Sequence, residues 1–211
     1  MPLNLQNGGN AVPHIRWLAS TSNWSHSSEA GMQPFQLGKA VFDLAGIRTG
    51  WGRFSENEPP QWVWDRSLTE PAPRPADGEW KRGFRVMVLL PKEFGEERLR
   101  EFATTGTGAV MGIDALYTEY EKHAVDHQGQ VPVVAFSGAT PTRIGKGNTN
   151  IPKLDITGWV DRPEGLEAAG QHEHPAPAAA TAVAKPAAVA VTPPAAATVA
   201  APQDPMLVTD F

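Results

Sequence analysis

The chain has 211 residues, of which 41% are hydrophobic, and it contains seven Trp and eight Phe. This length suits one well-packed domain and is short for two. Cysteine is absent, which excludes disulfide bonds, thiolate metal sites and a cysteine nucleophile. The formal net charge of -5 excludes a uniformly basic surface, so a nucleic-acid-binding face would have to gather its cations locally.

The distribution of aromatic residues divides the chain into parts. All Trp residues lie between Trp17 and Trp159, and after Trp159 no Phe, Tyr or Trp occurs before the terminal Phe211. A segment without aromatic side chains buries too little apolar surface to offset the entropy of ordering its backbone. We therefore expect a flexible arm at residues 1–10, a folded domain at 11–165, a disordered Ala/Pro-rich linker at 166–202 and a distinct tip at 203–211.

In chain order, the patterns predict short strands at residues 11–18, 39–44, 46–54 and 61–65, with a polar loop at 19–34. Residues 80–90 have the clearest strand pattern. A charged helix is expected over about 91–102, and a second helix over 109–123 has an apolar stripe. Strands at 131–136 and 154–160 and a hairpin region at 140–150 complete the domain.

This order of elements predicts a mostly β fold. Short strands with one or two helices before the last pair are typical of a five-stranded barrel of the OB-fold type, here followed by a disordered C-terminal tail. Periodicity alone leaves an SH3-like barrel and a β-sandwich open as alternatives.

Aromatic and cationic residues alternate on several of the expected strands. Single-stranded nucleic acid is bound in this way, by bases that stack on aromatic faces inside a cationic groove. We expect stacking contacts from Trp51, Arg53, Trp80 and Phe84, since Phe84 is flanked by cations and Trp51 lies between two glycines. Trp62 and Trp64 share one strand face, where they could equally form a core stripe. The cations expected at the same surface are Arg48, Lys81, Arg82, Arg85, Arg143, Lys146 and Lys153.

The sequence has no pattern typical of an active site. The loop around Lys146 lacks P-loop spacing, and residues 106–112 do not follow a strand as a dinucleotide fingerprint must. The six histidines form no supported metal or catalytic set. We therefore expect a binding protein with no enzymatic activity, no cofactor and no metal. The N-terminus lacks the pattern of a signal peptide, and the tail lacks the pattern of a membrane-spanning helix. We therefore expect a cytoplasmic protein with no membrane partner.

The C-terminal tip differs from the linker that precedes it. Residues 203–211 end in Asp210 and Phe211, with Asp204 nearby, so an apolar ring stands beside a free carboxylate and two acidic side chains. Such a peptide can place its ring in a partner's pocket while a Lys or Arg of the partner binds the carboxylate. We interpret the tip as a partner-docking peptide.

With these features the chain resembles the single-stranded DNA-binding proteins of bacteria and their phages. The resemblance covers the expected barrel, the low-complexity tail and the tip from Asp204 to Phe211, and the body looks most like a phage or mobile-element version. It implies sequence-tolerant binding and protection of single-stranded DNA in replication, recombination and repair, within a bacterial or phage-infected cell. It also implies recruitment of replication and recombination enzymes by the tip, and it allows a homo-oligomer.

Two other functions stay open on the sequence. One is a phage structural or protein-interaction module that does not bind nucleic acid, in which the tail is a spacer. The other is an enzyme of unrecognised type, whose convergent titratable groups one sequence would not reveal.

Overall fold

The computed structural model describes residues 13–55, 58–95 and 98–166, all within a unit that spans Met1–His172. The described part contains one α-helix, two short 3-10 helices and ten strands. The expected arm at 1–10, the tip at 203–211 and the linker beyond residue 166 lie outside the described residues. The strands are β1 His14–Leu18, β2 Asn23–Ser28, β3 Gly31–Phe35, β4 Lys39–Phe42, β5 Arg48–Arg53, β6 Gln61–Trp64, β7 Lys81–Leu89, β8 Leu99–Thr104, β9 Gln130–Ile144 and β10 Gly147–Asp161.

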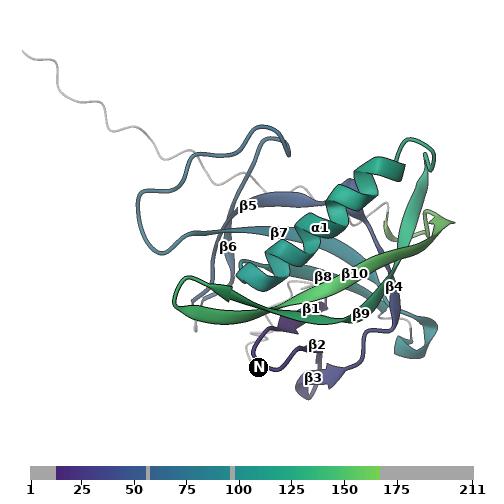
Figure 1. Ribbon diagram of the computed structural model, residues 1–211, viewed down its shortest axis with the longest axis horizontal. Coiled ribbons are helices and arrows are strands. Elements are labelled where there is room, and N and C mark those ends of the chain that lie inside the picture. Colours follow the sequence, from purple (N-terminus) through teal and green to yellow (C-terminus); the bar gives the residue numbers. More distant parts are fainter. Residues whose placement is uncertain (1–12, 56–57, 96–97, 167–211) are drawn as a thin grey trace, which may run out of the picture. The chain divides into compact units, whose positions relative to one another are not determined.

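All ten strands belong to one mixed sheet (Figure 1). The order is β10-β9-β4-β7-β8-β1-β2-β3, with β5 paired to β7 and β6 paired to β5. Every pairing is antiparallel except that of β1 with β8, which is parallel. Among the described strands β8 and β10 do not pair, so the sheet is not closed and the expected five-stranded barrel is not seen as such.

Strands β4 and β5 are two halves of one bent segment. Between them the 3-10 helix Leu44–Gly46 turns the chain, and the carboxylate of Asp43 caps it by accepting a hydrogen bond from the backbone of Gly46. Asp43 is buried, and Arg162 forms an ion pair with it at 2.8 Å. A buried carboxylate requires such a partner. The pair therefore joins the bend to the chain just after β10.

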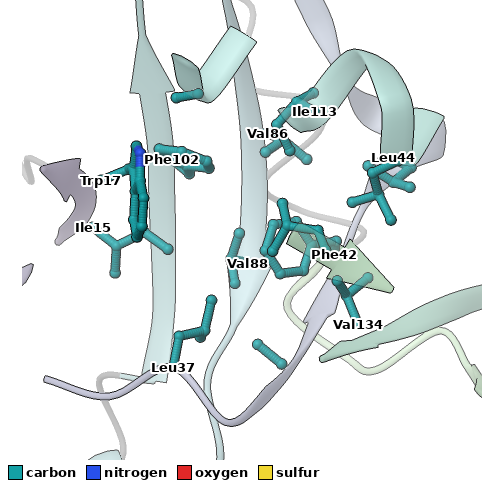
Figure 2. Packing of buried hydrophobic residues seen from close by; sticks show 14 of the residues in the cluster. Ile15, Trp17, Leu37, Phe42, Leu44, Val86, Val88, Phe102, Ile113 and Val134 are labelled. Carbon is teal, nitrogen blue, oxygen red and sulfur yellow. The ribbon is translucent and has the colours of Figure 1, made fainter. Parts of the chain in front are cut away.

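The core lies between the sheet and helix α1 (Thr107–His123). Phe42 packs near Val88 and Val134, with Leu44 and Ile113 close by (Figure 2). Helix α1 packs against β10 with very close backbone approach, because a Cβ on Gly112 would lie 2.8 Å from the carbonyl oxygen of Pro152. The apolar stripe expected on this helix is confirmed, since Ile113 and Leu116 are both buried.

Two of the sequence expectations about secondary structure are wrong. The helix expected over about 91–102 is not found in the described residues of this range: a 3-10 turn, Lys92–Phe94, precedes strand β8, whose buried face places Phe102 in the core. Residues 19–34 are not a loop, since β2 and most of β3 lie there, and Trp24 is fully buried. Tertiary packing of these aromatic rings outweighs the local helix and loop preferences.

The folded part reaches one residue further than expected. Leu166, the first residue assigned to the linker, is 1% exposed and packs with Met87, Leu89 and Val131 in a second apolar cluster. This cluster covers the end of the β7 face opposite the main core.

Phe84 is a core residue, so the prediction that its ring stacks on a base is wrong. Its side chain is 3% exposed and meets Phe102 edge-on at 5.0 Å between centroids. The flanking cations Lys81 and Arg85 point to the opposite side of the strand, and Arg82, on the same side as Phe84, is bound to Asp65.

Replacing Phe84 with Ala should lower the free energy of unfolding by about 3–5 kcal/mol, because a large buried ring is removed and a cavity is left. Phe54→Ala is the matched control, since Phe54 is 42% exposed, and it should cost much less. Urea unfolding of both variants measures the difference. Equal losses would contradict this assignment of Phe84 to the core.

Candidate nucleic-acid interface

Two tryptophans of β6 form a stacked pair on one face of the sheet. Trp62 and Trp64 lie two residues apart, so both point to the same side. Their rings are nearly parallel, with centroids 4.6 Å apart and an interplanar angle of 6°. Both side chains are half-buried. We call this pair, with the strand surface beneath it, the tryptophan platform.

Three glycines of the neighbouring strands form the floor of the platform. Gly50 and Gly52 of β5 lie opposite Trp64 and Trp62, and Gly83 of β7 lies opposite Gly50. A Cβ on Gly52 would lie 2.9 Å from the ring of Trp62, and one on Gly83 would meet the same ring. The ring of Trp62 therefore extends from β6 across β5 to β7, and it does so only because these positions lack side chains.

The outer faces of the stacked pair meet other side chains. The guanidinium of Arg48 lies over the ring of Trp64 at 4.8 Å, and Phe54 meets Trp62 edge-on at 5.7 Å. Phe54 is exposed. Burial and the nearby charge of Arg85 lower the pKa of Arg48, and Arg85 is itself paired with Glu101 at 2.8 Å. The platform thus has a cation at one end and an exposed ring at the other.

A hollow of about 350 Å³ adjoins the Phe54 end of the platform. Its volume lies at the lower end of the range for small-molecule sites, about 300–1,000 Å³. Lys81 lies opposite Gly52 in the sheet, so its side chain is on the platform face. The residues that line the hollow are Gly52, Arg53, Phe54, Ser55, Glu79, Lys81 and Thr105.

The segment that joins β6 to β7 is held by Asp65 on the opposite face of the sheet. Its carboxylate binds Arg82 through two hydrogen bonds, at 2.8 and 2.5 Å, and accepts one from Thr49 at 2.5 Å and one from the backbone of Ala72 at 2.8 Å. The side chain is only 3% exposed. The hydrogen bonds from Arg82, with those from Thr49 and Ala72, lower the pKa of Asp65 to about 2 despite its burial.

Trp51 helps to hold the same segment. Its indole nitrogen donates to the carbonyl of Ala72 at 2.9 Å, and the guanidinium groups of Arg74 and Arg82 lie over its ring at 5.5 and 5.3 Å. The ring surface of Trp51 and its indole N–H are therefore both occupied by other groups of the protein. Trp51 and Arg82 therefore serve the structure of this segment, on the face away from the platform.

The structure separates the predicted site residues into groups. Arg48, Lys81 and Arg85 lie on the platform face, whereas Trp51 and Arg82 do not. Trp80 is 7% exposed and covered by the guanidinium of Arg53 at 5.3 Å, so the prediction that Trp80 stacks on a base is wrong. Arg53 is bound to Gln61 at 2.7 Å and lines the hollow.

The remaining predicted cations lie on the last two strands. Arg143 and Lys146 are exposed at the turn of the β9–β10 hairpin, and Lys153 is exposed on β10. The start of helix α1 lies between the platform and the β9–β10 hairpin. Thr105, just before the helix, is close to Gly52 and Gly83 of the platform, and Gly108 in its first turn is close to Asn150 of β10. The docking residues Asp204, Asp210 and Phe211 lie outside the described residues.

Sequence reasoning left the best aromatic candidates unassigned. The sequence places Trp62 and Trp64 on one strand face, but it favours Phe84 because of its flanking cations and Trp51 because of its two neighbouring glycines. The signal that identifies the pair is the complementary spacing of Gly50-x-Gly52 and Trp62-x-Trp64 on adjacent strands. Phe54, Glu79 and Thr105 were also missed.

No family model, curated protein or solved structure that was compared with this chain matches it. In residues 13–55, 58–95 and 98–166 there is no group of three or more His, Asp or Glu placed to hold a metal ion. No helix in the same ranges has the length and apolar character needed to cross a membrane.

Stability should depend on pH through Asp65. Because its folded-state pKa is lowered from 3.8 to about 2, its contribution is present above about pH 4 and is lost as the pH falls towards 2. The shift corresponds to about 2 kcal/mol. Urea unfolding of the wild type and Asp65→Asn should show a difference that shrinks over this range. Asp77→Asn, on an 83% exposed side chain, is the control and should change little. A wild-type to D65N difference independent of pH would exclude this role.

Proposed function

We propose that the protein binds single-stranded DNA without strong sequence preference and that the tryptophan platform is its main contact surface. The observation that carries the proposal is the half-buried Trp62–Trp64 stack beside Arg48 and Lys81. Single-strand binding surfaces combine such aromatic faces with cations that follow the phosphates.

Bases would stack at the two ends of the pair. The inner faces of Trp62 and Trp64 cover one another, so only the outer faces are open to a ligand. Arg48 and the exposed Phe54 lie against these faces. A base could displace either side chain or stack beyond it. Each stacked base contributes about 1–3 kcal/mol. This arrangement favours the binding of extended, unpaired nucleotides over a duplex.

The phosphates would follow cations that have no ion-pair partner in the described part of the chain. Among them are Lys81 beside the platform, Arg143 and Lys146 at the turn of the hairpin, and Lys153 on β10. Arg82, Arg85 and Arg162 are instead neutralised by carboxylates of the protein. Since only a few cations lie near this path, the DNA affinity should fall as the salt concentration rises, with a moderate slope of log affinity against log salt.

The strand order supports an OB-like architecture within the larger sheet. If β4 and β5 are one bent strand, then this strand, β7, β8, β9 and β10 are five successive strands with α1 between the third and fourth. Their lateral order, β10-β9-β4-β7-β8, is that of an OB barrel opened between its third and fifth strands. β1 pairs with β8, and Trp17 donates to the carbonyl of Asn150 on β10 at 3.0 Å, so β1 occupies that opening.

The platform then coincides with the usual ligand-binding region of this architecture. OB-folds bind oligonucleotides on the face of the second and third strands, flanked by the loop between the first two strands and the loop between the last two. Here β6 belongs to the first of these connections, and the hairpin turn with Arg143 and Lys146 is the second.

Replacing Trp62 with Ala should weaken the binding of a thymidylate oligonucleotide at low salt by about 10-fold or more, because one stacking face is lost. Trp159→Phe is the matched control: Trp159 is also half-buried, but it stacks on His127 at 4.2 Å, away from the platform. Fluorescence anisotropy of a labelled oligonucleotide measures both.

Failure of the wild type to bind the oligonucleotide at low salt would refute single-stranded DNA binding. It would favour a structural or protein-interaction module, and regular assembly without DNA would support that alternative.

The tip at residues 203–211 completes the proposal as a docking peptide for replication, recombination or repair enzymes of a bacterial or phage-infected cell. On this account the protein protects and presents DNA and has no catalytic activity. Asp204, Asp210 and Phe211 supply the two acidic groups and the ring that a basic, apolar pocket would bind.

Deleting the last eight residues should abolish partner recruitment and leave DNA affinity unchanged or higher, because negative charge is removed. Co-precipitation from the host lysate and anisotropy on the same preparations measure the two effects. Phe211→Ala should reproduce the loss of recruitment. A deletion that abolishes DNA binding would contradict this division of roles.

A further inference from the structure

The hollow at the Phe54 end of the platform has a chemical character different from that of a phosphate site. Glu79 and Lys81 both line this hollow, and Lys81 lies opposite Gly52 on the platform face. Among the described residues neither has an ion-pair partner. A free carboxylate beside the hollow repels a phosphate, but it accepts hydrogen bonds from the edge of a base.

Phe54 connects this hollow to the stacking surface. Its ring is 42% exposed, meets Trp62 edge-on and also lines the hollow. A nucleotide beyond Trp62 could therefore lie against Phe54 with the edge of its base directed to Glu79 and Lys81. Arg53 also lines the hollow, but its guanidinium binds Gln61 at 2.7 Å and lies 3.8 Å from Asp77. Lys81 is thus the available cationic donor.

We infer that this hollow binds one base of the single strand and selects guanine. The inference rests on the proposed function. Guanine presents two adjacent N–H donors, N1–H and the N2 amino group, with the acceptor O6 next to them. A carboxylate can accept both donors at once, and an ammonium group can donate to O6. Adenine, cytosine and thymine each offer a carboxylate only one donor position on this edge, so they match the pair Glu79 and Lys81 less well.

The selection is local, so it is compatible with sequence-tolerant binding elsewhere. The platform stacks any base, whereas the hollow adds affinity when guanine occupies the one position next to Phe54. A DNA strand that slides along the protein would therefore bind most often with a guanine at that position.

The test compares three short oligonucleotides: thymidylate alone, the same with one central deoxyguanosine, and the same with deoxyinosine, which lacks the N2 amino group. The wild type should bind the guanine oligonucleotide about tenfold more tightly than thymidylate, and inosine should lose most of this gain. Glu79→Gln should abolish the preference while its affinity for thymidylate is unchanged or higher. Glu29→Gln, the same charge change at an exposed site in the β2–β3 turn, should keep the preference.

The outcomes separate this inference from the proposed function. If the wild type binds all three oligonucleotides equally, or if E79Q keeps the preference, guanine selection is overturned while single-stranded DNA binding stands. If the wild type binds none of them, both fail.

Discussion

The candidate site depends on the absence of three side chains. Gly50, Gly52 and Gly83 let the rings of Trp62 and Trp64 lie directly on the backbone of β5 and β7, where a Cβ would be too close to the rings or to neighbouring backbone. This contact supports the pair from below and leaves its outer faces and upper edge for a ligand. A glycine within a strand normally weakens it, so three such positions beneath one aromatic pair indicate a surface retained for its shape.

The two faces of strands β5, β6 and β7 have different roles. One face carries the core residues Phe84 and Val86 and, beyond them, the Asp65 network that fixes the segment between β6 and β7. The other carries the platform and, further along β7, the small cluster around Met87 and Leu166. A rigid segment behind the sheet therefore holds β6 in register, and β6 supplies the rings in front.

Ion pairs within the described part of the chain engage several of its charged residues. Asp43, Asp65 and Glu101 each neutralise an arginine inside the protein, so several acidic residues act within the fold and not at its surface. The net charge of the whole chain is thus a poor guide to the field at one patch. What matters for a nucleic acid is that Lys81, Arg143 and Lys146 are exposed.

Much of the fold could be predicted from sequence patterns, and the site only in part. The strand at Lys81–Leu89, the helix at Thr107–His123 and the hairpin of the last two strands follow from local periodicity. The many charged residues of 91–102 predict a helix where strand β8 lies, because the burial of Arg100 and Phe102 depends on distant partners. Likewise, nothing local distinguishes the covered Trp80 from the half-exposed Trp62. Only the cross-strand register, which joins Gly52 to Trp62, makes that distinction.

Photocrosslinking with an oligonucleotide that carries 5-bromodeoxyuridine, followed by mass spectrometry of the peptides, tests the central claim most directly. The account predicts crosslinks at Trp62, Trp64 and Phe54, which present the open aromatic surface. Crosslinks confined to Trp51, Trp159 or other residues away from the platform would contradict it.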